Sequence, residues 1–423
     1  MSYSDPSTGA EPTFGRRRDT AAHKAPLRTA VFMAAWLALH GGAAAAGLPA
    51  LISEAVNTDP AILEARANED VAGSRAAASR AQHYPTVGVQ AGGYVANPAG
   101  LNPPFRGLVG RLNVYAAGSI DTAIQRDELK QQSLQHKTSE TRELVAMNVA
   151  QLFLEALRAK ELMAVEQNNL ERHEKIVGDL EVVVENDKGR RYELVQAQSR
   201  ALQVRMRIVQ YEKSMKLALS KLTRYTRQSA TLENPIPSEW RQSLPDSAPA
   251  RPHPSIETQR LEAEAVRAEQ RTLQRQRLPR VDLEAGAGNQ RYARMVLNWA
   301  FFDRSADFTV QSAAKQIAAA EQRTDLLQRD IDQRSATAEA DMAQSLLQIK
   351  AAEQQIGASA KVVELYELQF KVGRRSLIEL VNAHAELAGV EASRVIAAND
   401  YRQAVVNYLY ANALLADWAT ARR

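Results

Sequence analysis

The 423-residue sequence has no cysteine. That absence excludes disulfide bonds, zinc–cysteine clusters, thiol catalysis and a lipid-modified N-terminal cysteine. The sequence also lacks a run of about 18 apolar residues, so no transmembrane helix is predicted. Its seven histidines have no metal-ligand spacing, and neither a glycine-rich phosphate loop nor a nucleophile elbow is present. We therefore expect no catalytic residue, no metal and no other cofactor, and predict that the protein is not an enzyme.

A strong excess of one charge is also missing. Lysine and arginine together number 53 and aspartate and glutamate 49, which gives a formal net charge of +4 at pH 7. This value is small for the length of the chain, and the basic residues are spread along it. Nucleic acid is therefore not expected as a partner.

The N-terminus carries the pattern of an export signal. Basic residues precede an apolar run over residues 30–39, and the small residues that follow offer Ala-x-Ala cleavage sites up to Gly47. This order predicts a secretory signal peptide over residues 1–46. The alternative, an amphipathic or buried helix, fits poorly because the run is uniformly apolar and stops in small residues.

Residues 280–303 alternate between apolar and polar side chains with the period of two that a β-strand requires. Leu283 falls on one face and Glu284 on the other. A Gly288-Asn289 turn signal separates two such runs. The pattern predicts a β-hairpin with an apolar face toward lipid and a charged face toward water. A soluble sheet with one face on a core is the alternative that the alternation leaves open.

The same pattern occurs nearer the N-terminus, between Val87 and Ala116, with a longer proline-containing loop between its two strands. The pair Leu112-Asn113 of this hairpin recurs as Leu297-Asn298 in the later one. The sequence therefore predicts four strands. The side chains expected to face lipid are Val87, Val89, Leu112, Val114, Leu283, Leu297, Trp299 and Phe301.

The order of features around the two hairpins indicates an internal duplication. A helical pattern that ends at Pro85 precedes the first hairpin, and one that ends at Pro279 precedes the second. Each hairpin is followed by a long helical pattern without proline. The predicted organisation is a signal peptide (1–46), a first repeat (47–227), an irregular proline-rich connector (228–252) and a second repeat (253–423).

The two long helical patterns, over residues 119–185 and 305–370, exceed what a globular domain of this size needs. In the second, apolar residues from Leu346 through Ala360 to Phe370 are spaced by three or four positions, which is typical of a coiled-coil seam. At about 1.5 Å per residue, each helix reaches on the order of 100 Å. The predicted fold class is mainly α with a small β part.

Each long helix ends near a glycine that is followed by a basic pair and a new helix. The residues are Gly189, Arg190 and Arg191 in the first repeat and Gly373, Arg374 and Arg375 in the second. A glycine stops the incoming helix, and we expect a positive φ at both glycines because a Cβ is penalised in that conformation. These segments are predicted to be the tips of helical hairpins. Their basic residues are either solvated turn residues or docking and gating residues.

Four strands cannot close a barrel in a membrane, where an open sheet edge has no hydrogen-bond partner. If the strands span a membrane, several chains must share one barrel. Two chains supply about eight strands, whose interior side chains fill, whereas three supply about twelve and can enclose water. A water-filled conduit therefore favours at least a trimer.

Taken together and in this order, the features resemble the TolC-like outer-membrane efflux and secretion channels of Gram-negative bacteria. The local matches are Asp59-Pro60, Tyr84-Pro85, residues 112–115 and the tip sequences 189–197 and 373–383. The resemblance implies a homotrimer in the cell outer membrane, with four strands per chain in a shared transmembrane β-barrel. It also implies long antiparallel coiled-coil helices that form an α-helical tunnel in the periplasm, closed at its far end by the tips.

The resemblance further implies roles for the tip residues. Glu193 and Arg375 lie where an acid and a base hold the tips shut. Phe370 lies at an aromatic gate position and Glu379 at an acidic position that lines the entrance, whereas Asn382 stands where some members carry a second acid. Docking to a periplasmic adaptor (membrane fusion) protein is expected at Gly189, Arg190, Arg191, Gly373 and Arg374.

We therefore predict the exit duct of a tripartite export machine. Its expected partners are outer-membrane lipid, the adaptor and an inner-membrane ATP-binding or proton-driven transporter. The stretch from Gly189 to Ala197 looks most like members that serve type I protein secretion, and small-molecule or drug efflux is the alternative. A periplasmic coiled-coil adaptor or scaffold is the alternative of another class, and it predicts soluble strands and a single helical hairpin.

Overall fold

A computed structural model describes residues 46–92, 105–237, 239–243 and 252–421 of the chain. Two compact units are distinguished, Met1–Ala44 and Ala45–Arg423, and all of the described residues belong to the second. Apart from Ala46, the predicted signal peptide lies outside the described residues. The proline-containing loop predicted within the first hairpin lies outside them as well.

The described chain is mainly helical with one four-stranded sheet, which confirms the predicted fold class. Its first half contains α2 (Leu48–Thr58), α3 (Pro60–Ala81), β1 (Thr86–Ala91), β2 (Arg106–Tyr115), α4 (Ser119–Asn186), the 3₁₀ turn η1 (Lys188–Arg190), α5 (Arg191–Leu222) and the 3₁₀ turn η2 (Trp240–Ser243). Its second half contains α6 (Pro254–Arg275), β3 (Arg280–Gly288), β4 (Arg291–Asn298), α7 (Arg304–Lys371), α8 (Leu377–Ala411) and α9 (Leu415–Thr420). Helix, two strands, long helix and returning helix follow in the same order in both halves.

Matching start signals open the two helices that lead into the strands. Asp59 precedes Pro60 of α3, and its Oδ1 accepts a hydrogen bond from the backbone N–H of Ala61 at 2.8 Å. His253 precedes Pro254 of α6, and its Nδ1 accepts from the N–H of Ser255 at 3.2 Å. Proline suits the first helical position because its missing N–H would have no partner there and its φ is already helical. Both cap residues satisfy donors that a helix start leaves free.

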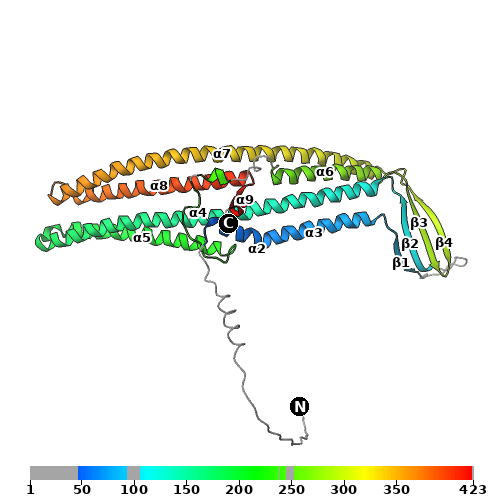
Figure 1. Cartoon of the computed structure of the whole chain (residues 1–423), viewed down its shortest axis with the longest axis horizontal. Helices are drawn as coiled ribbons and strands as arrows, with labels where there is room; N and C mark the ends of the chain where they lie inside the picture. The colour runs from blue at the N-terminus through cyan, green and yellow to red at the C-terminus, as the bar shows by residue number, and fades with distance from the viewer. Residues whose placement is uncertain (1–45, 93–104, 238, 244–251, 422–423) are drawn as a thin grey trace, which may run out of the picture. The chain divides into compact units, whose positions relative to one another are not determined.

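The helices form two long antiparallel hairpins, α4 with α5 and α7 with α8, and α4 also packs along α8. Helix α3 lies beside α4, and α6 lies between α4 and α7. Both α4 and α7 are 68 residues long, as the proline-free patterns predicted. The sheet lies at one end of these helices and the two hairpin tips lie at the other (Figure 1).

The largest core lies midway along the bundle, where short segments surround the middle of α4. Phe153 and Leu154 of α4 pack there with Trp418 of α9 and Leu409 of α8, all fully buried. Each such side chain contributes roughly 1.5–3 kcal/mol through burial. The described part of the connector joins this core through Leu232, Ile236 and Trp240. The core therefore holds the middle of the long helices in place. The sheet lies at one end of these helices and the tips lie at the other.

Hydrogen bonds also attach the connector to the rest of the described chain. Ala46 donates its N–H to the carbonyl oxygen of Ser229 at 2.8 Å and accepts from the N–H of Thr231 at 2.9 Å. Arg402 of α8 donates to Glu161 of α4 at 2.8 Å and to Asn234 of the connector at 3.0 Å. The connector thus joins both halves of the described chain, while the predicted repeat boundaries stay a prediction.

The sheet has the order β1-β2-β3-β4, and every pair is antiparallel. The central pair, β2 with β3, joins one hairpin to the other, with Leu112 opposite Leu283 and Arg111 opposite Glu284. An irregularity follows Asn113, so that Tyr115 pairs with Val281. Among the described residues, no helix combines the length and the apolarity needed to cross a membrane.

Candidate functional site: a two-faced sheet and two helical tips

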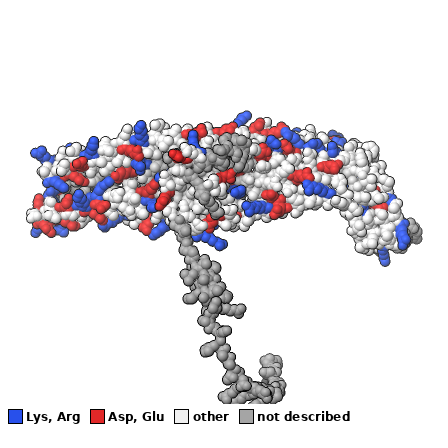
Figure 2. All heavy atoms as spheres, in the orientation of Figure 1, with Lys and Arg blue, Asp and Glu red and all other residues white. Residues whose placement is uncertain are grey.

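One face of the sheet is apolar and exposed. Residues that pair directly across antiparallel strands point to the same face, so the register assigns side chains to faces. Val87 and Val89 of β1 are 73% and 80% exposed, and Leu297 of β4 is 64% exposed. Leu112 and Leu283, which pair with each other, lie on this same face. In the view of Figure 2 the sheet is mainly uncharged, whereas charges of both signs are mixed over the helices.

The opposite face of the sheet carries a polar network around Glu284. Its carboxylate accepts from the Tyr292 hydroxyl at 2.7 Å and from Arg294 at 3.1 Å, both on β4. Arg111 of β2 lies 3.5 Å away on the other side. Asn113 donates to Asp282 at 2.8 Å in the next row. The network shows that the two faces differ in chemistry, one apolar and one charged, as the alternation predicted.

Three predicted strand residues require correction. Tyr115, rather than Val114, pairs with Val281 and continues the apolar face, because the irregularity after Asn113 inserts one residue into β2. Trp299 and Phe301 lie beyond the end of β4, which stops at Asn298. They are exposed, with ring centroids 6.3 Å apart, between the sheet and α7.

The turn at the first tip begins with an aspartate cap. Asp187 follows α4, and its Oδ1 accepts from the N–H of Gly189 at 2.9 Å, which starts the η1 turn. The positive-φ glycines of the described residues are Gly118 and Gly373, so the predicted positive φ at Gly189 is wrong. The reason is local, because the aspartate cap continues the chain in a right-handed 3₁₀ turn and α5 follows directly. Arg190 then pairs with Glu193 at 2.6 Å.

At the second tip, α7 ends at a glycine with a positive φ, as predicted. Gly373 has a φ of +73°, its N–H donates to the carbonyl of Phe370 at 2.9 Å, and the N–H of Arg374 donates to Gln369 at 2.9 Å. This pattern is a Schellman motif, which glycine favours at the left-handed position. Helix α8 then starts with a capping box in which Ser376 and Glu379 bond each other's backbone N–H.

The two tips pack against each other through a small apolar cluster. It contains Ile176, Leu180, Ala197, Leu377, Leu380 and Val381, with Tyr366 and Phe370 partly buried against it. The guanidinium of Arg190 lies over the ring of Phe370, 5.7 Å from its centroid. Arg190 thus contacts both Glu193 of its own tip and Phe370 of the other tip. Phe370, the predicted gate residue, lies in this intertip cluster within the chain.

Glu193 and Arg375, predicted to pair with each other, each have a partner within the chain. Glu193 accepts from Arg190, and Arg375 forms an ion pair with Glu379 one turn into α8. Arg375 also donates to Gln369 at 2.9 Å and lies over the ring of Tyr366, 4.3 Å from its centroid. The hydrogen bonds from Ser376, together with Arg375, lower the pKa of Glu379. Any pairing of Glu193 with Arg375 must therefore exchange existing contacts.

Comparisons with known proteins agree with this geometry. Residues 51–226 match the family described as outer membrane efflux protein. The structure resembles the outer membrane protein VceC from Vibrio cholerae, with a TM-score of 0.76 and 18% identity over 86% of this chain and 96% of VceC. The first half of the chain therefore matches this efflux family, and most of the chain has the fold of a solved outer membrane protein. Family members are channels and not enzymes, as predicted.

Two further solved outer membrane channels have the same fold as this chain. The Campylobacter jejuni CmeC outer membrane channel has a TM-score of 0.74 and 13% identity over 86% of this chain and 85% of its own. The Neisseria gonorrhoeae MtrE outer membrane channel, in its open state, has a TM-score of 0.68 and 15% identity over 86% of this chain and 88% of its own. At these identities the similarity shows a shared fold. The comparison with curated protein sequences gave no match.

The buried acid Glu143 was not predicted from the sequence. Glu143 of α4 accepts from the N–H groups of Leu415 at 3.0 Å and Ala416 at 3.2 Å, which start α9. Burial raises the pKa of Glu143 to about 7, although these two hydrogen bonds act in the opposite direction. The signal in the sequence was weak, because a single Glu in a long amphipathic helix has the pattern of a solvated residue.

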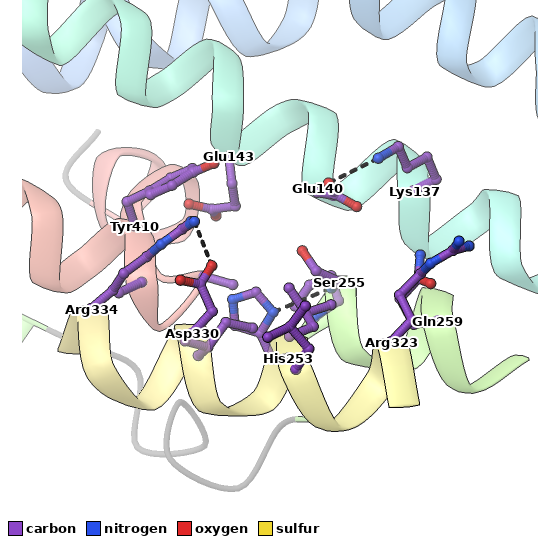
Figure 3. Close-up of a pocket in the computed structure, with 16 residues that line it drawn as sticks. Lys137, Glu140, Glu143, His253, Ser255, Gln259, Arg323, Asp330, Arg334 and Tyr410 are labelled. Atoms are coloured by element: carbon purple, nitrogen blue, oxygen red, sulfur yellow. Dashed lines mark hydrogen bonds and ion pairs between the residues drawn. The ribbon is translucent and has the colours of Figure 1, made fainter. Parts of the chain in front are cut away.

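Glu143 lies at a cavity of about 530 Å³ between α4, α6, α7 and the end of α8. Figure 3 shows Arg334 directed at Asp330, its ion-pair partner at 2.5 Å, and Lys137 directed at Glu140, its partner at 2.9 Å. Four of the charged side chains around the cavity are therefore paired, two on α4 and two on α7. Within the described residues, no group of three or more His, Asp and Glu side chains is placed to hold a metal ion.

Proposed function

We propose that three copies of this chain form an exit duct in the outer membrane of a Gram-negative bacterium. The observation that carries the proposal is a sheet with one apolar and one charged face whose outer strands, β1 and β4, pair with one strand each. A sheet with open edges is not viable in lipid, and about twelve strands from three chains can close around water. The match of residues 51–226 to the outer membrane efflux protein family supports the location and the channel function.

The helical part of the duct is proposed to cross the periplasm. The two 68-residue helices each extend about 100 Å at about 1.5 Å per residue. Their returning partners, α5 and α8, make each arm a hairpin whose tip lies at the end opposite the sheet (Figure 1). Three chains supply six such hairpins, which can surround a central tunnel.

The tips are proposed to dock a periplasmic adaptor protein and, through it, an inner-membrane ATP-binding or proton-driven transporter. The docking residues are Gly189, Arg190, Arg191, Gly373 and Arg374. Arg191 and Arg374 support this role because both are exposed at the turns. Arg190 is less available, since it already contacts Glu193 and Phe370.

The gate is proposed to form between chains at the same tips. In the closed duct, Glu193 of one chain pairs with Arg375 of the next, in exchange for the contacts that each makes within its own chain. Exposed ion pairs contribute only about 0–1 kcal/mol each, so three copies bias the gate toward closure and still let an adaptor open it. Phe370 and Glu379 line the entrance in this proposal.

The gate is tested by the conductance of the purified protein in planar bilayers. Arg375→Glu should raise the single-channel conductance because attraction becomes repulsion, and adding Glu193→Arg should lower it again. Glu379→Gln is the matched control, because it removes the competing partner of Arg375 and keeps a residue that can complete the capping box. It should leave the conductance unchanged or lower it.

Two outcomes would count against the gate. If Glu379→Gln opens the duct as Arg375→Glu does, the ion pair within the chain is what matters. If the double exchange fails to restore closure, Glu193 and Arg375 do not pair. A purified protein that inserts into bilayers and never conducts would overturn the duct itself.

Type I protein secretion is the cargo class that we propose, supported by the tip sequence from Gly189 to Ala197. Small-molecule efflux is the second candidate, supported by the description of the matched family. Deletion of the gene separates the two, since loss of a secreted polypeptide indicates the first and increased sensitivity to small toxic compounds indicates the second. The adaptor or scaffold alternative is disfavoured, because it predicts one helical hairpin and the chain has two.

A further inference from the structure

A pair of buried histidines lies where the two helical hairpins touch. Helices α4 and α8 make most of the contact between the hairpins. His173 of α4 and His384 of α8 face each other there, with ring centroids 6.2 Å apart. They are 3% and 1% exposed. Two buried imidazoles in contact at this helix–helix boundary call for a physical reason, since an apolar pair would pack as well.

The surroundings leave the pair poorly satisfied. Neither ring nitrogen of His384 has a hydrogen-bond partner, and the Oδ1 atom of the buried Asn169 side chain has none either. The Nε2 atom of His384 lies 3.3 Å from the carboxylate of Glu367 on α7, without the geometry of a hydrogen bond. A buried polar group without a partner costs free energy. The contact between α4 and α8 therefore contains groups that would gain from meeting water or a proton.

The charges that face the pair come from all four long helices. Arg200 and Arg207 of α5 and Glu166 of α4 face His173, and Arg207 bonds Glu166 at 2.8 Å. Arg172 and Lys175 of α4 and Glu367 of α7 face His384. Arg172 in turn pairs with Glu391 of α8 at 2.8 Å.

Both imidazoles are neutral in this arrangement. Burial lowers the pKa of each to about 4. Nearby positive charge acts in the same direction, from His384 and Arg207 on His173 and from Arg172 and Lys175 on His384. A histidine freed into water has an ordinary pKa of about 6.5. Because the contact lowers both pKa values, its stability is complete above pH 6.5 and is lost as the pH falls through that range toward 4.

We propose that His173 and His384 form an acid-sensitive contact whose protonation separates the α4–α5 hairpin from the α7–α8 hairpin. Glu367 lies on the same hairpin as His384, so it can hold the new proton there while the two imidazolium rings repel each other across the boundary. At pH 5 each histidine favours separation by about 20-fold relative to pH 7. The consequence for the channel rests on the proposed function, because separation of the hairpins is what would widen the tunnel.

Spin labels test the separation directly. The chain has no cysteine, so Glu181→Cys on α4 and Ala385→Cys on α8 give two unique labelling sites on exposed positions. Labelled protein is mixed with an excess of unlabelled protein so that the distance within one chain is measured. The distance distribution should move to longer values between pH 7.5 and pH 5. Replacing both rings, in His173→Phe with His384→Phe, should abolish the shift.

Controls keep the result interpretable. His83→Gln, at an exposed position before β1, should leave the shift unchanged. If the double phenylalanine variant does not assemble, His173→Gln is tested alone. The logarithm of the equilibrium constant for separation should then change half as much between pH 7.5 and pH 5, because one proton is taken up in place of two. A label distance that stays constant between pH 7.5 and pH 5 in the unaltered background would overturn the proposal. An equal shift in the double variant would also overturn it.

The same samples in planar bilayers separate this inference from the proposed function. A conductance that rises at pH 5 together with the label distance supports both. A protein that never conducts, at either pH, would overturn the duct, whereas the label distances would still decide the role of the histidine pair.

Discussion

Two tip glycines that look alike in sequence have different backbone requirements. Gly373 adopts a φ of +73°, in which a Cβ meets its own carbonyl oxygen, whereas Gly189 lies in a right-handed turn started by Asp187. At Gly189 an added Cβ would lie 3.1 Å from the Oδ1 atom of Asp187, a side chain that can adjust. The cost of replacing each glycine therefore differs in kind.

Gly373→Ala should destabilise the second tip by about 1–2 kcal/mol, the cost of a left-handed conformation for a residue with a Cβ. Gly189→Ala should cost only a few tenths of that. Hydrogen exchange of the backbone amides at the start of α8 and of α5 measures the two effects in the same protein. Equal loss of protection at both tips would contradict the difference.

The buried carboxyl group of Glu143 should make the stability of the folded chain depend on pH. Its folded pKa of about 7 lies above the ordinary 4.5, so the folded chain holds a proton that the unfolded chain releases. The stabilisation from that proton is complete below pH 4.5 and is lost as the pH rises through 7. Glu143→Gln should therefore lower the melting temperature more at pH 5 than at pH 8. A deficit that is the same at both pH values would show that Glu143 is not protonated in the folded protein.

At the scale of elements, the pairing register determines which side chains share a face of the sheet, and helix caps stabilise the tips. The β2–β3 pairing places Leu112 opposite Leu283 on one face and Arg111 opposite Glu284 on the other. A shift by one residue would move every apolar side chain to the charged face. The polar network around Glu284 therefore opposes register shifts, since the hydroxyl of Tyr292 and the guanidinium of Arg294 both donate to it.

Leu283→Arg tests the face assignment. If the position lies near the middle of the bilayer, a charge facing lipid should cost about 2–4 kcal/mol and reduce assembly in the outer membrane. Asp282→Asn, the adjacent residue on the other face, should assemble normally because it keeps an oxygen for Asn113 to donate to. Normal assembly of Leu283→Arg would remove the support for a lipid-facing surface.

At the scale of the whole molecule, the sheet of the described residues has two edge strands. Strands β1 and β4 are its outer strands and are separated by two others. With neighbouring strands about 4.8 Å apart, β1 and β4 of one chain lie about 14 Å apart, too far for a disulfide bond. Strands of another chain can be adjacent to both edges in a closed barrel.

Cysteine cross-linking tests that closure. Val89→Cys on β1 is combined in turn with Ala293→Cys, Met295→Cys or Leu297→Cys on β4, since all four positions lie on the apolar face. One of the combinations should give covalent dimers and trimers under oxidation, and Val89→Cys alone should not give trimers. Monomers from all three combinations would contradict a barrel shared between chains.

The helices and strands could be predicted from the sequence, because hydrophobic periodicity and the proline and glycine signals at the ends of elements depend on neighbouring residues. The period of two located four strands, the absence of proline allowed two 68-residue helices, and proline after Asp59 and His253 started the helices that lead into the strands. The faces of the strands followed from the same alternation as far as Asn113. A family resemblance then supplied the assembly and the gate residues, which remain proposals.

The tertiary structure alone decided which residues meet. Leu346 and Ala360 fit the expected seam of α7, but Ser345 and Ser359 are buried in their place, because the twist of α7 against α8 selects the face. The irregularity that puts Tyr115 in the row of Leu297, the contact between His173 and His384, and the partners of Glu193 and Arg375 likewise depend on long-range packing. Periodicity gives the angle of a side chain about its own element, and only packing determines what lies opposite.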